Sequence, residues 1–174
     1  PPPVQRYLQG AGVVGAPRVH SYRVRLHGRI RDGRNGRWMP IAAEQYNVTD
    51  PPARLFYLNA SMAGVPVQGY HRYVADAASM RVRAAAIVPV VSARGREMTR
   101  SETVTLLNDM CVMAPATLVE RGVEWLAWSE RSARARFRNA GHIVEADLIF
   151  DAAGELVDFV SDDRSIAGPG DAMT

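Results

Sequence analysis

The chain has 174 residues, of which 47% are hydrophobic and 22% charged, with a formal net charge of +3. This composition is typical of a globular protein, and the length predicts a single domain over residues 1–164, followed by a loop or disordered tail over 165–174. Cys111 is the only cysteine, which excludes an internal disulfide framework and any multi-cysteine metal site.

No window approaches the roughly 18 consecutive apolar residues of a membrane span. The N-terminal stretch PPPVQRYLQG has no hydrophobic region of the kind found in signal peptides. The expected localisation is therefore cytoplasmic by default. The charge is uneven along the chain: residues 1–100 contain 15 Arg and 5 acids, and residues 101–174 contain 6 Arg and 13 acids. Such asymmetry indicates either a polyanion-binding half or two halves that neutralise each other on folding.

Residues 1–8 predict a short N-terminal helix with proline in its first turn. The pattern then changes to alternation between apolar and polar residues, which is typical of half-buried strands. Pro89 places the last strand of this run at a sheet edge or a bulge, because proline has no N–H for the ladder. The predicted strands are 21–31, 37–49, 53–62, 67–76 and 79–91, with a turn at DGRNG between the first two.

The segment TRSETVTLLNDMCVMA predicts a longer helix over residues 99–114. Thr99 and Glu102 form the pattern of an N-terminal capping box, and Pro115 ends the helix. Four further strands are predicted at about 123–128, 132–138, 142–150 and 155–161. Strands on both sides of one helix indicate an antiparallel α+β fold rather than βαβ units.

The hairpin RARFRNAGHIVEADLIF has one register that satisfies both of its faces. Pairing residues whose numbers sum to 281 places Arg136 opposite Glu145 and Arg134 opposite Asp147. The same register pairs apolar residues on the other face, and a slip by one residue would disrupt both sets. These arginines are therefore predicted to stabilise a hairpin rather than to bind a ligand.

The strand SYRVRLHGRIR carries a second arginine stripe, which includes Arg23, Arg25 and Arg29. If the turn pairs Ile30 with Trp38, these arginines have no carboxylate opposite them. The partners of these arginines are then solvent, a more distant acidic strand or helix, or an anionic ligand. The aromatic residues of this region, Tyr22, Trp38, Tyr46 and Phe56, fall with the apolar set, and this pattern argues against nucleic-acid binding.

Glu44 has two possible environments. In the same register it points into the apolar interior, where burial would raise its pKa and make it a candidate general acid or base. A register shifted by one residue would instead turn it outward to an arginine as a cross-strand ion pair. The histidines have no metal-ligand spacing and no cofactor fingerprint is present, so neither a metal nor a cofactor is predicted.

Five stretches of the chain carry a resemblance: PPPVQRYL, RWMPIAAEQYNVTDPPARLF, LNDMCVMAPATL, GVEWLAWSERSARARF and LIFDAAGELVDFVSDDR. They resemble an uncharacterised bacterial domain family that occurs often in actinobacteria, and the similarity spans essentially residues 1–164. The resemblance implies further strands after SDDR in family members. The order of elements is similar to that of LolA and LppX-type lipid-carrier half-barrels. This similarity implies a strongly curved antiparallel sheet with the 99–114 helix on its concave face.

The leading prediction is non-enzymatic binding of a hydrophobic or lipid-like small molecule in a cavity between the sheet and the helix. The alternatives are an enzyme that uses general acid–base chemistry through Glu44, and a protein-interaction domain that pairs through an exposed sheet edge. The predicted headgroup ligands are Arg23, Arg25 and Arg29. The predicted ligand-lining residues are Trp38, Glu44, Tyr46, Phe56, Met62, Leu107, Met110 and Met113.

Overall fold

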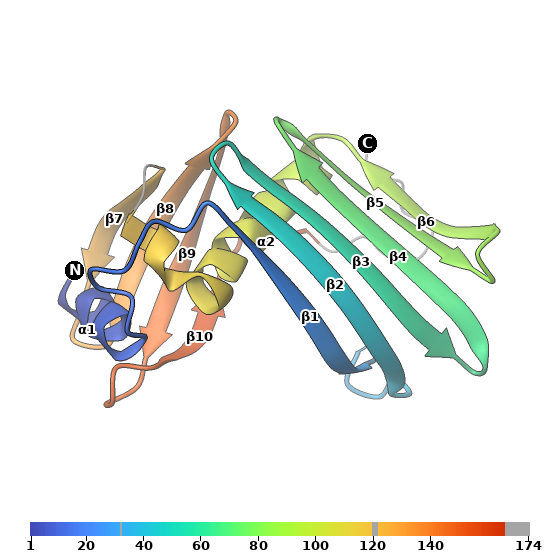
Figure 1. Ribbon diagram of the computed structural model, residues 1–174, viewed down its shortest axis with the longest axis horizontal. Helices are drawn as coiled ribbons and strands as arrows, with labels where there is room; N and C mark the ends of the chain where they lie inside the picture. The colour runs from blue at the N-terminus through green and yellow to red at the C-terminus, as the bar shows by residue number, and fades with distance from the viewer. Residues whose placement is uncertain (32, 120–121, 166–174) are drawn as a thin grey trace. The chain divides into compact units, whose positions relative to one another are not determined.

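The computed structural model describes residues 1–31, 33–119 and 122–165. These residues form an α+β fold with two antiparallel sheets (Figure 1). The helices are α1 (Pro2–Gly10), α2 (Arg96–Met113) and the short 3-10 helix η1 (Pro115–Val119). The strands are β1 (Ser21–Ile30), β2 (Met39–Thr49), β3 (Pro52–Met62), β4 (Val65–Val74), β5 (Ala77–Ala84), β6 (Val88–Arg94), β7 (Val123–Trp128), β8 (Ser132–Asn139), β9 (His142–Phe150) and β10 (Leu156–Val160).

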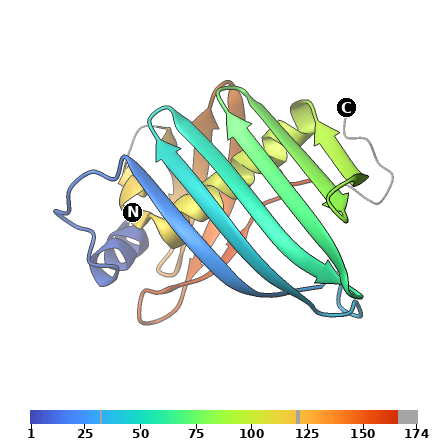
Figure 2. The ribbon, with the colours of Figure 1, turned by 45° about the vertical axis from the view of Figure 1, so that its right-hand side comes forward.

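The strands separate into two open sheets where the sequence predicted one. The first sheet has the order β1-β2-β3-β4-β5-β6, and the second has the order β10-β9-β8-β7. Figures 1 and 2 show β1–β6 side by side in chain order. Each sheet is a meander because each strand pairs with its neighbour in the sequence through a short turn. The segment that contains α2 and η1 interrupts this series between β6 and β7.

The chain divides into two compact units, one comprising Pro1–His20 with Arg100–Ser165 and the other containing Ser21–Thr99. The six-stranded sheet therefore belongs to one unit, and the four-stranded sheet to the other. The boundary falls inside α2, so its first turn belongs with the six-stranded sheet. The placement of the long helix over a concave sheet face stays a prediction.

The four-stranded sheet has a closed apolar core. The predicted register of the β8–β9 hairpin is confirmed, with Arg136 opposite Glu145 and Phe137 opposite Val144. Alternate residues of both strands are buried, as expected when one face of a sheet packs against other elements. From α1, the Tyr7 hydroxyl donates a 2.6 Å hydrogen bond to the carbonyl of Cys111, and its ring lies 5.7 Å from that of Phe150.

The β1–β2 hairpin forms as predicted, but its register is shifted by one residue. Ile30 pairs with Met39 rather than with Trp38, and Arg25 consequently pairs with Glu44. The turn segment contains several polar and glycine residues, any of which suits a turn, so its composition alone did not fix the loop length. The shift moves every β2 side chain to the face opposite the predicted one.

The predicted strand 79–91 is wrong as a single element. It is a hairpin of β5 and β6, and its turn contains Ala85 and Ala86 with φ of 49° and 65°. Left-handed backbone is usually marked by glycine or asparagine, and this turn has neither, which hid it from sequence analysis. The prediction for Pro89 is confirmed, because β6 is an edge strand and its pairing with β5 shifts between Val82 and Arg83.

Helix α2 begins before the predicted capping box. Its first residue is Arg96, so Thr99 lies inside the helix. The Thr99 hydroxyl donates to the carbonyl of Gly95 at 2.9 Å and accepts a hydrogen bond from the backbone N–H of Ala78 at 3.1 Å. Thr99 thus ties the first helical turn to β5 instead of capping the helix. None of the described helices is long and apolar enough to cross a membrane. Beyond Ser165, the predicted tail lies outside the described residues.

Candidate functional site

The pairing of β1–β6 sorts their side chains onto two faces, because residues directly opposite each other share a face. We call them the apolar face and the polar face. The large hydrophobic side chains of the apolar face include Val24, Leu26, Phe56, Leu58, Met80 and Val82. Within these strands, the arginines of the polar face are Arg23, Arg25, Arg29, Arg72, Arg81, Arg83 and Arg94.

The apolar face is incompletely covered. Phe56, Leu58 and the other large side chains named above are half-buried. The residues of this face that are fully buried are mostly small or polar; Tyr73 is the large exception. Each half-buried apolar side chain leaves hydrocarbon surface in water, which costs about 25 cal/mol per Å². The face is therefore suited to binding an apolar group.

A polar cluster at the β2–β3 end of the same face was missed by sequence analysis. The Gln45 side-chain amide donates to Asn47 at 2.8 Å, and the Asn47 amide donates to the Tyr22 hydroxyl at 2.6 Å. The buried guanidinium of Arg54 donates to the Gln45 side-chain oxygen at 3.2 Å and lies 4.9 Å from the centre of the Phe56 ring. The signal that the sequence offered for this cluster was the spacing of Gln45 and Asn47, which puts two amide side chains on the same face of one strand. These hydrogen bonds offset the cost of burying the amides.

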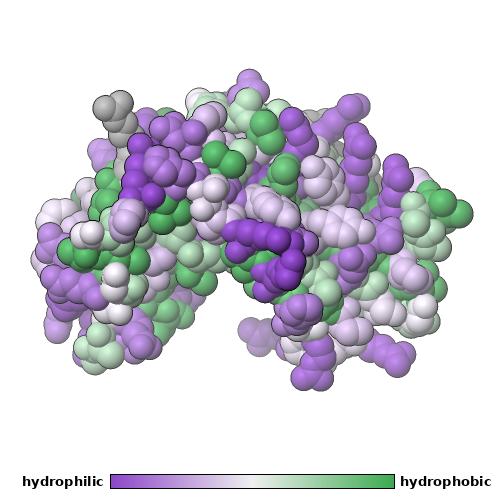
Figure 3. Space-filling model, viewed as in Figure 1, coloured by the Kyte–Doolittle hydropathy of each residue, from purple (hydrophilic) through white to green (hydrophobic). Residues whose placement is uncertain are grey.

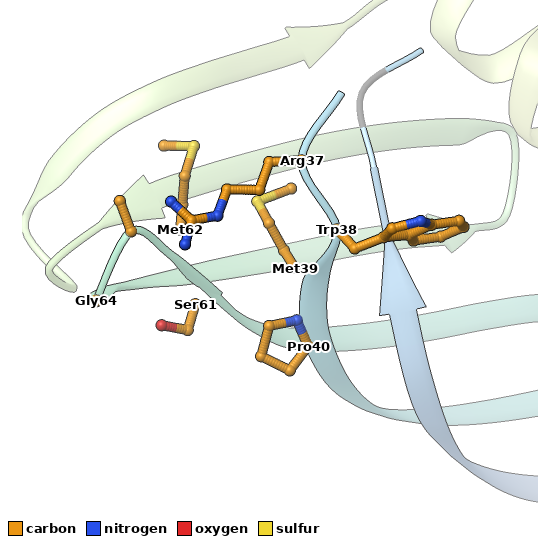
Figure 4. A pocket seen from close by; sticks show the side chains of 8 residues that line it. Arg37, Trp38, Met39, Pro40, Ser61, Met62 and Gly64 are labelled. Carbon is orange, nitrogen blue, oxygen red and sulfur yellow. The ribbon is translucent and has the colours of Figure 1, made fainter. Parts of the chain in front are cut away.

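A pocket of about 370 Å³ lies where β2 begins and β3 ends (Figure 4). Met39 and Met62 extend the apolar face to this end of the sheet, and Arg37 lies beside them in the close-up view. Two of the predicted ligand-lining residues, Trp38 and Met62, are therefore part of one pocket wall. The lining consists of Arg37, Trp38, Met39, Pro40, Ser61, Met62, Ala63 and Gly64.

The Trp38 ring itself points away from Met62, toward β1 (Figure 4). The guanidinium carbons of Arg31 and Arg29 lie 4.6 and 5.7 Å from the centre of this ring. These are cation–π distances. The indole of Trp38 therefore packs against arginines that flank the end of β1.

Glu44 lies on the polar face, where it forms an ion pair with Arg23 and lies 4.0 Å from Arg25. It also accepts a 2.7 Å hydrogen bond from the Tyr46 hydroxyl. These contacts hold the pKa of Glu44 below its usual value, with the Tyr46 hydrogen bond as the largest cause and the two arginines adding to it. The inward-facing alternative for Glu44 is wrong, because the register turns the side chain outward. An ionised, paired carboxylate lacks the raised pKa that general acid catalysis required of it.

The remaining predicted ligand-lining residues do not gather on one face. Phe56 lies on the apolar face, with its ring 5.6 Å from the ring of His71, whereas Tyr46 lies with Glu44 on the polar face. Leu107 and Met110 are buried within α2, and Met113 is partly exposed. The predicted headgroup arginines all belong to the polar face, away from Phe56.

The thiol of Cys111 is buried, and this burial raises its pKa to about 12, with the nearby Asp109 adding to the effect. A thiol that stays protonated is not a nucleophile at neutral pH. Among the residues that the structure describes, no three His, Cys, Asp or Glu side chains form a group that could hold a metal ion.

The chain as a whole matches one family model, which covers residues 1–174. It belongs to the family of unknown function DUF6544. This membership confirms the predicted resemblance to an uncharacterised domain family. No curated protein and no solved structure matches the chain. The similarity to LolA-type half-barrels stays a prediction.

Proposed function

We propose that the six-stranded sheet binds a single-chain anionic amphiphile such as a fatty acid, with the hydrocarbon tail on the apolar face. The observation that carries this proposal is the half-burial of Phe56, Leu58 and their large apolar neighbours. A tail lying on these side chains removes hydrocarbon from water on both sides of the contact. Each buried methylene contributes about 0.8 kcal/mol, so a long chain binds well even in a shallow groove.

The pocket at the end of the sheet is a suitable site for the anionic head group of this ligand. Met39 and Met62 carry the apolar surface into it, and thioether side chains adapt to ligands of different shape. Arg37 supplies a guanidinium, and no carboxylate within residues 1–31, 33–119 and 122–165 forms an ion pair with it. A pocket of about 370 Å³ is within the range of about 300–1,000 Å³ that is common for small-molecule sites.

Arg37 thus takes the role that was predicted for Arg23, Arg25 and Arg29. Those three side chains project from the polar face, so one ligand could not place its tail on the apolar face and its head among them. The likeness of the element order to LolA-type half-barrels supports a carrier role, by analogy of topology alone.

The direct test is thermal unfolding of the purified protein with and without saturating palmitate. A ligand at 100 times its Kd stabilises the folded state by about 2.7 kcal/mol, which raises the Tm by several degrees. Arg37→Gln should reduce this shift, because the anionic head loses its guanidinium. Arg34→Gln removes an exposed arginine from the same turn and should leave the shift unchanged. If saturating palmitate leaves the Tm of the unaltered protein unchanged, the proposal is contradicted.

A second candidate function is protein interaction through the edge strand β6. Val88 and Val90 of β6, and Ile87 just before it, are large hydrophobic residues that are 54%, 52% and 78% exposed. Exposed edge strands with apolar side chains pair readily with other strands. Light scattering over a range of protein concentrations tests this: self-association that is lost in Val90→Lys supports it, and a constant monomer mass argues against pairing between copies.

A further inference from the structure

The polar face of the same sheet carries a second site, and its geometry points to binding of single-stranded nucleic acid. The site is centred on Tyr57 and Tyr70, which are directly opposite each other on β3 and β4. Tyr70 is in turn opposite Arg81 of β5. We call this region the tyrosine–arginine face, and it consists of Tyr57, Tyr70, Arg72, Arg81, Arg83 and Arg94. In the space-filling view, side chains over the six-stranded sheet are mostly purple to pale violet (Figure 3).

Both tyrosine rings are available for stacking. Tyr57 is 43% exposed and Tyr70 is 39% exposed. The Tyr57 hydroxyl donates a 3.2 Å hydrogen bond to the side-chain oxygen of Asn59, which restrains the ring along its own strand. Adjacent aromatic side chains on an exposed sheet face form a platform on which successive bases stack.

The charge around this platform is mainly positive, with Glu44 directly opposite Tyr57 as the exception. Among the described residues, no carboxylate lies within ion-pair distance of Arg72, Arg81, Arg83 or Arg94. Glu44 is the single acid that the described strands β1–β6 place on this face, and Arg23 and Arg25 already surround it. Free guanidinium groups in this number favour a polyanion, and phosphates accept from them in bidentate geometry.

The tyrosines and two of the arginines share a shallow pocket of about 270 Å³. Gln68 provides amide hydrogen-bonding groups between Tyr57 and Arg83, and the strand order places Arg81 beside Tyr70. A base on the tyrosine pair would therefore have its phosphate within reach of a guanidinium. The pocket lining consists of Tyr57, Gln68, Gly69, Tyr70, Arg81, Arg83 and Ala86.

The residues between the arginines favour nucleic acid over an anionic membrane. They are hydrogen-bonding side chains, including Asn59, Gln68, Ser79 and Ser92. A membrane-binding surface would present a continuous set of tryptophan, phenylalanine or leucine side chains to the lipid, whereas Leu55, opposite Arg72, is a single leucine among these polar residues. The sequence predicted no nucleic acid because four aromatic residues were assigned to the apolar set: Tyr22, Trp38, Tyr46 and Phe56. The observed register moves Tyr46 out of this set and places it beside Arg23.

The test is fluorescence anisotropy of a labelled twelve-nucleotide oligouridylate with the whole protein. We expect binding that weakens steeply with salt. The double variant Tyr57→Ala/Tyr70→Ala should weaken binding by about tenfold or more, from the loss of stacking. Tyr57→Phe/Tyr70→Phe keeps both rings and should retain binding. Arg81→Gln/Arg83→Gln should make the fall of log K with log salt less steep. The magnitude of the slope should decrease by about 1.4, since two phosphate contacts are lost at about 0.7 each.

The matched controls are Leu55→Ala on the same face and Arg34→Gln in the β1–β2 turn, which should leave the affinity unchanged. Melting temperatures equal to that of the unaltered protein show that each variant is folded. Three results would overturn the inference: no binding at low salt, equal affinity for a duplex of the same length, or binding that is insensitive to loss of both tyrosine rings. Binding to phosphatidylglycerol vesicles without binding to the oligonucleotide would also overturn it, in favour of a membrane.

Discussion

The two sheets of this chain are both built from hairpins, but they differ in how completely their apolar faces are buried. In the four-stranded sheet, Phe137, Val144 and Leu148 are 2% exposed or less. In the six-stranded sheet, Phe56 and Leu58 lie on the apolar face and are only half-buried. One sheet therefore has a completed core, which gives stability. The other leaves apolar surface available, and this is the basis for proposing that it binds a ligand.

The largest expected effect compares one substitution in the two sheets. Phe137→Ala should lower the free energy of unfolding by about 3–5 kcal/mol, because the side chain is fully buried and a cavity remains. Phe56→Ala should cost about 1–2 kcal/mol, since less hydrocarbon is lost from a half-buried site. Urea unfolding of both variants measures the difference. Equal losses would show that the six-stranded sheet is packed as tightly as the other.

Gly122 and Gly141 provide a comparison within the four-stranded unit. A Cβ atom on Gly122 would lie 2.9 Å from the carbonyl oxygen of Arg138, and the residue has a φ of +102°. We expect Gly122→Ala to cost about 3 kcal/mol, from backbone strain and this close contact. Gly141, in the β8–β9 turn, has a φ of +82° and nothing within 4 Å of its added Cβ. Gly141→Ala should cost only about 1 kcal/mol by the same unfolding measurement, the strain of left-handed backbone alone. A larger loss in Gly141→Ala than in Gly122→Ala would contradict this packing.

The charged ladder of the β8–β9 hairpin should give a smaller effect. Arg136→Glu and Glu145→Arg should each destabilise the protein, since each places like charges opposite one another. The double variant should recover part of this loss. Recovery is incomplete because Arg134 also bonds Glu145 at 3.0 Å and would face the new arginine. A double-mutant cycle in urea checks the coupling, and a sum of the two single losses would argue against the register.

The smallest expected effect concerns acid stability. Hydrogen bonds from Arg136 and Arg134 hold the pKa of Glu145 below its ordinary value of 4.5. Ionised Glu145 thus stabilises the folded state above its unfolded pKa, and this contribution is lost as the pH falls below 4.5 through the lowered folded-state pKa. Glu145→Gln should therefore flatten the fall in stability over this range. Unfolding curves measured from pH 6 to pH 3 test this, and an unchanged slope would contradict it.

The sequence predicted an element well where two independent constraints agreed. The β8–β9 register satisfied charge pairing on one face and apolar pairing on the other, so a single solution remained. The β1–β2 register had only the turn to define it and was wrong by one residue. That one shift moved Glu44 and Tyr46 to the polar face. It overturned the inward position of Glu44 on which the general acid–base hypothesis depended, and it added a tyrosine to the arginine stripe.

Other features had no local signal in the sequence. The β5–β6 turn uses alanines in left-handed backbone, and Thr99 forms hydrogen bonds to Gly95 and Ala78 instead of capping α2. The division into two sheets means that β6 and β7, which flank α2 in the chain, belong to different sheets, and residue patterns within strands do not encode this. Trp38 and Met62 were predicted to line a cavity between the sheet and the helix, and the pocket that they line is at the end of the sheet. Arg37 and Met39, which also line it, were not predicted, because they depend on how the hairpin ends are brought together.

The central claim is that the apolar face of the six-stranded sheet binds a hydrocarbon tail. Leu58 and Leu55 lie on the same strand but on opposite faces, and both are leucines, so they form a matched pair. Native mass spectrometry with added palmitate should show one-to-one adducts for the unaltered protein and for Leu55→Glu, and no adduct for folded Leu58→Glu. Adducts that persist in Leu58→Glu, or that are lost equally in both variants, would contradict the assignment of the ligand to this face.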